Sequence, residues 1–123
     1  MASPKVGSVS MILAAVSGAS SVAMAAYGAH GTKGMSEAFR KSYNNGNKLH
    51  MIHSTVLLGL ALGVAGDSKV LKRPKLTTAL FASGILLFSG SCYLAALTGN
   101  RKNGRFAPIG GTALILGWLS LVL

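Results

Sequence analysis

Three histidines carry most of the chemistry that this sequence could support. His50 and His53 are three residues apart, so a helix would place them on one face. Histidine nitrogens bind metal ions and haem iron, which raises the hypothesis of a metal, haem or quinone site built from His30, His50 and His53 with help from Tyr93. In the structural alternative, neutral imidazoles form hydrogen bonds to one another, to Asn47 or to carbonyls at helix ends. We favour this alternative because no carboxylate lies beside the histidines to orient them as metal ligands.

The sequence contains no set of residues typical of an enzyme. Its two acidic residues, Glu37 and Asp67, are expected on opposite sides of a membrane, which excludes an acid–base pair. The glycines are not followed by the Lys-Ser/Thr ending of a phosphate-binding loop. The one cysteine, Cys92, excludes an internal disulfide and is expected to pack as a small apolar side chain rather than act as a nucleophile. We therefore predict that the protein is not an enzyme and has neither a catalytic residue nor a bound cofactor.

Long stretches without charge must position these residues. Half of the 123 residues are hydrophobic and only 11% are charged, too few to cover the surface of a soluble protein. Such stretches match the roughly 20 apolar residues that cross a hydrocarbon core of about 30 Å. The predicted spans cover residues 6–29, 49–66, 76–98 and 107–123. The first begins like a secretory signal, with Lys5 followed by an apolar run and Ala23-Met24-Ala25. Its length favours a span that is retained.

Residues 35–45 have a different pattern, because apolar and charged residues alternate there with a helical period. The pattern predicts a short amphipathic helix, either in the membrane interface or capping the bundle. The predicted fold is thus an all-α membrane protein, one domain over residues 1–123, with four transmembrane helices in a bundle and this short helix between the first and second. Gly59 and Gly63 have the GxxxG spacing, which we interpret as a helix contact within the chain.

The positive charge is concentrated in the connectors. Twelve Lys and Arg residues face two acidic ones, and bases between apolar runs are typical of contact with lipid headgroups rather than with nucleic acid. The expected headgroup contacts are Lys69, Lys72, Arg73, Lys75, Arg101, Lys102 and Arg105.

Four spans put both termini and the 67–75 loop on one side, here called side A, and the 28–48 connector and the 98–106 loop on side B. Five bases on side A against seven on side B do not set an orientation.

This topology places all three histidines on side B. The same side receives the end of the first span, the end of the third and the start of the fourth. Residues from these segments are therefore predicted to converge with the histidines: Tyr27, Asn47, Tyr93 and the Pro108, Gly110 and Gly111 turn.

Four motifs carry a resemblance to a known family: Tyr27-Gly28-Ala29-His30-Gly31, Asn47-Lys48-Leu49-His50-Met51-Ile52-His53-Ser54, Leu87-Phe88-Ser89-Gly90-Ser91-Cys92-Tyr93, and Ala107-Pro108-Ile109-Gly110-Gly111 followed by Gly117-Trp118. In this order the sequence resembles the small four-span membrane proteins that include vertebrate transmembrane protein 256 and the bacterial YwdK-like proteins, over nearly the whole chain. His50-Met51 is more similar to the animal members, since bacterial ones tend to have Tyr-Gln there. Cys92 stands where bacterial members usually have an aliphatic residue.

The resemblance implies the fold, an integral membrane location and, for a eukaryotic member, the mitochondrial inner membrane. The family is one of unknown function, so the resemblance implies no reaction or ligand. It marks as family motif residues Tyr27, Gly28, His30, Gly31, Asn47, His50, His53, Ser91, Tyr93, Pro108, Gly110, Gly111 and Trp118.

The predicted function is that of a non-catalytic accessory or assembly subunit of a larger, respiratory-type membrane complex. The expected partners are the lipid bilayer, anionic lipid such as cardiolipin, and other membrane subunits. Two alternatives stay open: a metal-, haem- or quinone-handling protein that uses the side B histidines, and a small-solute carrier.

Overall fold

The computed structural model describes residues 4–123, with side chains from Val9 onward; the side chain of Lys5, one of the five side A bases, lies outside the described residues. The helices are α1 (Pro4–Gly31), α2 (Glu37–Ala65), α3 (Pro74–Thr98) and α4 (Ala107–Ser120), with a single 3-10 turn, η1 (Arg101–Gly104), before α4. No residue between 4 and 123 is in a strand, and the all-α prediction is confirmed for this range.

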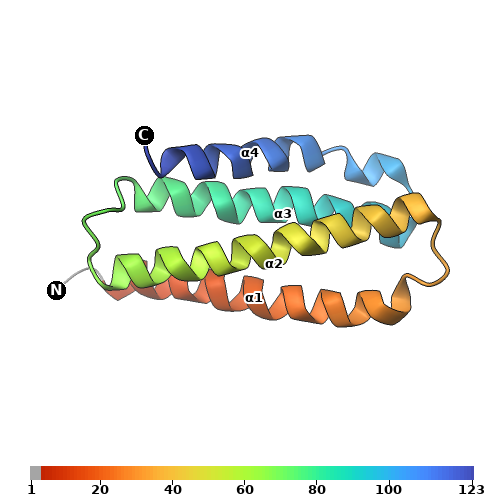
Figure 1. Ribbon diagram of the computed structural model, residues 1–123, viewed down its shortest axis with the longest axis horizontal. Helices are drawn as coiled ribbons and strands as arrows, with labels where there is room; N and C mark the ends of the chain where they lie inside the picture. The colour runs from red at the N-terminus through yellow and green to blue at the C-terminus, as the bar shows by residue number, and fades with distance from the viewer. Residues whose placement is uncertain (1–3) are drawn as a thin grey trace.

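The helices pack in chain order as antiparallel neighbours (Figure 1). Each helix contacts the next, from α1 to α2, α2 to α3 and α3 to α4, so that α1 and α4 form the two outer edges. The start of α1, the α2–α3 loop and the end of α4 lie at one end, side A, and the other two connections lie at side B (Figure 1).

Within the described residues, three helices are long and apolar enough to cross a membrane: Val9–Gly31 of α1, and the whole of α2 and α3. The fourth helix differs from the predicted span 107–123. It has 14 residues and ends at Ser120, so it is about 21 Å long and shorter than a hydrocarbon core of about 30 Å. Pro108 lies in its first turn, where a missing N–H costs nothing.

The short amphipathic helix predicted over 35–45 is not separate from the second span, and this prediction was wrong. Residues Glu37–Ala65 form one helix of 29 residues. Its start is set by Ser36, whose side chain accepts a hydrogen bond from the Phe39 N–H at 3.4 Å. As a consequence, His50 and His53 lie in the middle of a helix, and Lys48 is on that helix rather than in a connector.

At Gly46, α2 stays helical and lies close to α3, where the sequence suggested a break. A Cβ at Gly46 would lie 2.6 Å from Cys92 Cβ, so the backbone of α2 directly contacts the Cys92 side chain of α3 at this point. The hydroxyl of Ser89 donates to the Gly46 carbonyl at 2.7 Å and holds the two helices together. Tertiary contact therefore overrides the low helix propensity of the Asn- and Gly-rich stretch.

The GxxxG pair does not make the helix contact within the chain that its spacing suggested. A Cβ at Gly59 would meet nothing within 4 Å, because this residue lies on the exposed face of α2. Gly63 instead faces the side chain of Leu71 in the α2–α3 loop.

Gly46→Ala is expected to lower the free energy of unfolding by about 2 kcal/mol, because the new methyl group pushes α2 away from Cys92. Gly59→Ala is the matched control and should be neutral or stabilising by up to about 1 kcal/mol through helix propensity alone. Thermal unfolding in mild detergent, followed by fluorescence of the single tryptophan, measures both. Equal behaviour of the two variants would contradict the close contact.

Glycines also set the distance between α3 and α4. A Cβ at Gly84 would lie 2.6 Å from Leu114 Cδ2, and one at Gly117 would lie 3.0 Å from the Phe81 ring. At the side B end of α4, Gly110 lies directly against the backbone of α3 at Phe88. Close approach at small residues is how helices gain packing energy in lipid.

Candidate functional site

A chain of hydrogen bonds crosses the interior of the bundle and joins α1, α2 and α3. The Tyr93 hydroxyl is 2.8 Å from His50 Nδ1 and 3.1 Å from Asn47 Nδ2. The other ring nitrogen of His50, Nε2, is 3.2 Å from Ser20 Oγ. Asn47 Nδ2 also donates to the Ser21 carbonyl at 3.0 Å.

The directions of these hydrogen bonds follow from the groups at the two ends. The Asn47 amide nitrogen only donates, so it gives one proton to Tyr93, and Tyr93 gives its own proton to His50 Nδ1. Nε2 of His50 then carries the ring proton and donates to Ser20, which donates in turn to the Ser17 carbonyl at 3.0 Å. This assignment gives every proton an acceptor and leaves His50 neutral.

A second branch continues from the same helices. The Ser54 hydroxyl donates to the His50 carbonyl at 2.6 Å, and Ser17 Oγ is 2.6 Å from Ser54 Oγ. Because the Ser54 proton is already committed, Ser17 is the donor of this pair.

His53 belongs to a separate cluster on the α3 and α4 side of α2. Its Nδ1 is 2.7 Å from the Leu49 carbonyl, and the Trp118 indole N–H donates to its Nε2 at 3.0 Å. A carbonyl only accepts and an indole only donates, so His53 is neutral with its proton on Nδ1. Phe81, fully buried, completes the cluster, with its ring centroid 5.5 Å from that of His53 and 5.4 Å from that of Trp118.

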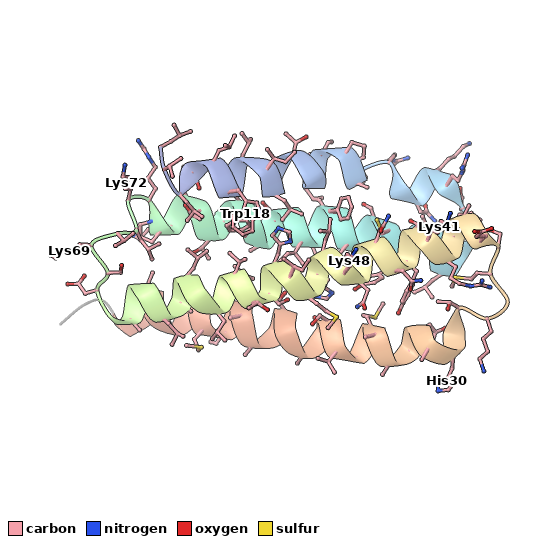
Figure 2. All side chains as sticks on the ribbon, viewed as in Figure 1. His30, Lys41, Lys48, Lys69, Lys72 and Trp118 are labelled. Atoms are coloured by element: carbon pink, nitrogen blue, oxygen red, sulfur yellow. The ribbon has the colours of Figure 1, made fainter. Side chains whose placement is uncertain are left out.

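The predicted convergence at side B is therefore only partly present. Asn47, His50 and Tyr93 come together as predicted, inside the side B half of the bundle. His30 is exposed and points away from the bundle at its side B end (Figure 2). Tyr27 is 51% exposed.

Most of the remaining motif residues pack against neighbouring side chains or helices. Gly28 faces the Tyr43 ring, Gly31 faces Tyr27, and Cys92 faces Gly46. Ser91 is buried on α3, and Gly110 packs against α3 at Phe88. Pro108 is exposed, and Gly111 meets only the edge of the Phe88 ring at 3.6 Å.

The three histidines do not form a metal-binding set. Both ring nitrogens of His50 and both of His53 take part in hydrogen bonds to other groups, and His30 lies elsewhere. Over the part of the chain that the structure describes, no three His, Cys, Asp or Glu side chains gather as metal ligands would. The imidazoles instead join helices, but through Ser20, Tyr93 and Trp118 rather than through one another or Asn47, which the structural alternative named.

The seven bases expected at lipid headgroups all lie exposed at the two ends of the bundle, where Figure 2 marks Lys69 and Lys72 at side A. At that end Lys72 Nζ donates to the Val122 carbonyl at 3.4 Å, and Arg73 donates to Leu123 O at 3.1 Å. Two of the bases thus also contact the residues that follow α4.

Sequence reasoning missed the serines of the network and the pairing of Trp118 with His53. A signal for the serines was available: Ser17 and Ser21 are four residues apart, and Ser20 is three residues from Ser17, so all lie near one face of α1. Small polar residues on one face of a span are typical of interhelical hydrogen bonds.

Tyr93→Phe is expected to lower the free energy of unfolding by about 2 kcal/mol, because it leaves the Asn47 amide and His50 Nδ1 without their partner in the bundle interior. Tyr27→Phe makes the same chemical change at an exposed position and should change stability by less than about 0.5 kcal/mol. Thermal unfolding in detergent compares the two. A loss of similar size in both would mean that the network does not stabilise the fold.

Comparison with known proteins identifies one family of small membrane proteins. The sequence profile of the family described as "Protein of unknown function (DUF423)" matches residues 24–111. A UPF0382 membrane protein of Haemophilus influenzae is 37% identical over 112 residues, 90% of this chain and 88% of the relative. UPF0382 membrane protein YwdK of Bacillus subtilis is 34% identical over 116 residues, 92% of each chain. No solved structure matches the chain.

Proposed function

Because this chain belongs to the DUF423 family of UPF0382 membrane proteins, which includes YwdK, we propose that it is a non-catalytic, four-span accessory or assembly subunit of a larger membrane complex. The resemblance to YwdK-like proteins is confirmed by these relatives. The proposal extends to a respiratory-type complex, because the chain is a small Gly-rich bundle with basic loops and an apolar exterior. The sequence resemblance adds the mitochondrial inner membrane for a eukaryotic member, while the relatives named above are bacterial.

The observation that carries the proposal is the position of Lys48. This side chain is exposed on α2 and lies well inside the length of the bundle rather than at its end (Figure 2). Its neighbour Asn47 bonds to Ser21, which is ten residues, or about 15 Å, from the end of α1 at Gly31. Lys48 therefore lies on α2 at a level where the neighbouring helices α1 and α3 carry no charged side chain.

The chain cannot neutralise this charge by itself. Its two acidic residues are Glu37 and Asp67. Glu37 is 3.5 Å from Lys41, and Asp67 follows the far end of α2, at side A. A charged side chain at membrane depth is costly and is normally paired or in contact with water. A carboxylate on a neighbouring membrane subunit would supply the missing partner.

Two further observations support a subunit rather than an enzyme. Both ring nitrogens of each buried histidine are engaged in hydrogen bonds, and these include bonds to neighbouring helices, which supports a structural role for the two residues. Large apolar side chains are exposed along α4, including Ile109, Ile115 and Leu119, as in a helix that faces lipid or another subunit. The same exposure supports α4 as a fourth span. Because α4 is shorter than the hydrocarbon core, either the bilayer is thinner beside it or a partner subunit covers the remaining depth.

The metal and haem alternatives would require histidine nitrogens that are engaged in the bundle. A carrier would require polar groups that line a path for its solute, whereas the protons of the network hydroxyls here are donated to other groups of the bundle. We therefore propose neither.

The direct experiment is the native size of the endogenous protein after mild detergent extraction, on a native gel with mass spectrometry of the band. Migration with a complex much larger than the 12.6 kDa chain would support the proposal and identify the partner. Migration as one or two chains would refute it.

Lys48→Glu is expected to reduce the fraction of the protein found in the complex at least about tenfold, because it places like charges together at the interface. Lys33→Glu makes the same change at an exposed position in the α1–α2 connector and should leave the complex intact. If Lys48 only reaches lipid phosphate, both variants will assemble equally well. Blotting of native gels measures the bound and free fractions.

A further inference from the structure

A groove runs along the bundle between α1 and α3, with α2 as its floor. Its volume is about 540 Å³. Most of its lining is apolar, from side chains such as Leu13, Val16, Ile85 and Leu86. Along α3 it extends from Ala82 to Tyr93, about 16 Å, which is close to half of a hydrocarbon core of about 30 Å. The groove is thus as long as a single lipid tail.

The groove also has a polar strip that belongs to the hydrogen-bond network: Ser17 and Ser20 from α1, His50 from α2 and Tyr93 from α3. Each proton in this strip is already committed. The Ser17 proton goes to Ser54, the Ser20 proton to the Ser17 carbonyl, and the Tyr93 proton to His50.

The polar strip can therefore accept further hydrogen bonds from a ligand but cannot donate any. Ser17 Oγ accepts no hydrogen bond within the network and keeps both of its lone pairs, and Ser20 Oγ keeps one after accepting from His50. A molecule that complements this groove must have an apolar body and a polar end that donates a hydrogen bond. In hydrocarbon, where no bulk water competes, this difference between donor and acceptor decides which molecule fits.

We propose that the groove binds one lipid alcohol, a long apolar chain that ends in a hydroxyl, with the hydroxyl donating to Ser17 Oγ and the chain lying between α1 and α3. A quinone would not match, since its ring carbonyls only accept hydrogen bonds. A fatty-acid ester would not match for the same reason. The inference concerns a ligand within one copy of the chain and does not depend on the subunit role.

The test uses the purified full chain in phosphatidylcholine nanodiscs and a diazirine-bearing photoreactive hexadecanol, with peptide mapping by mass spectrometry. We expect labelling of the groove-facing peptides of α1 and α3. Unlabelled hexadecanol should compete at least about fivefold better than hexadecyl methyl ether, which has a similar chain and no donor, as expected for one net hydrogen bond. Equal competition by the ether would overturn the proposal, because the groove would then select only an apolar chain.

A pair of glycine variants tests the location. Gly90 lines the groove, and a Cβ there would meet nothing within 4 Å, so the side chain of Gly90→Leu would start from open space and occupy part of the groove. Gly59→Leu makes the same change on an open face of α2 outside the groove. Labelling should be lost in the first variant and retained in the second. Labelling of α1 and α3 that persists in Gly90→Leu would overturn the site.

Ser17→Ala tests the hydrogen bond. It removes the proposed acceptor and leaves no donor without a partner, because Ser54 still donates to the His50 carbonyl. The variant should still be labelled but should lose the preference for the alcohol over the ether. A preference that survives in Ser17→Ala would contradict the assigned contact, and the unfolding temperature of each variant confirms that it is folded.

Discussion

Replacing Gly110 by alanine is expected to destabilise this protein more than Gly46→Ala does, by about 3 kcal/mol or more. The new Cβ would fall on the backbone of α3, 2.7 Å from the Leu87 carbonyl carbon and 2.8 Å from Phe88 Cα, with Phe88 N closer still. A flexible side chain could rotate away from such a contact, but a helix backbone cannot. The start of α4 would have to separate from α3.

The neighbouring residue provides the control for Gly110→Ala. A Cβ at Gly111 would meet the Phe88 ring at 3.6 Å, an ordinary van der Waals distance, so Gly111→Ala should be close to neutral. Thermal unfolding and limited proteolysis of the loop before α4 measure both variants in detergent. If Gly110→Ala unfolds at the temperature of Gly111→Ala, the close approach of α4 to α3 is wrong.

The second large effect is expected for His53→Ala, at about 2 to 3 kcal/mol. The substitution removes an imidazole packed between Phe81 and Trp118, and it leaves the indole N–H of Trp118 without its acceptor. Because the chain has one tryptophan, its emission reports this contact directly. We expect a shift in the Trp118 emission maximum together with a lower unfolding temperature.

His30→Ala is the matched control, since His30 is exposed at the side B end. It should alter neither the emission of Trp118 nor the unfolding temperature. A large effect of His30→Ala would instead favour a site that all three histidines share, which is the metal or haem hypothesis raised by the sequence.

The sequence predicted the presence and type of the helices because charge-free runs of this length have few other interpretations. It failed at Asn44–Lys48, where asparagines, a glycine and a lysine are typical of a connector. In the structure, Gly46 is the contact point with Cys92, and Asn47 bonds to α1 and α3. The local propensity of these residues is overridden by contacts with helices distant in the sequence, which a single sequence does not display.

The error at that point explains most of the errors at the candidate site. With α2 starting at residue 49, His50 and His53 would lie at a membrane surface together with His30. With α2 starting at Glu37, they lie more than three turns along the helix, where His53 reaches Trp118 and His50 reaches Tyr93. The i, i+3 spacing correctly predicts that the two imidazoles share a helix, but they bond to different neighbouring helices.

The antiparallel order of the helices has a consequence for how the chain is made. During synthesis α2 enters the membrane with only α1 beside it. His50 and Asn47 must wait for Tyr93 on α3, and His53 must wait for Trp118, about 50 residues beyond the end of α2. At roughly 5–20 residues per second, that wait is about 3 to 10 seconds. Throughout it, His53 on α2 remains without its final partner, so the packing around α2 is completed only after α4 has been made.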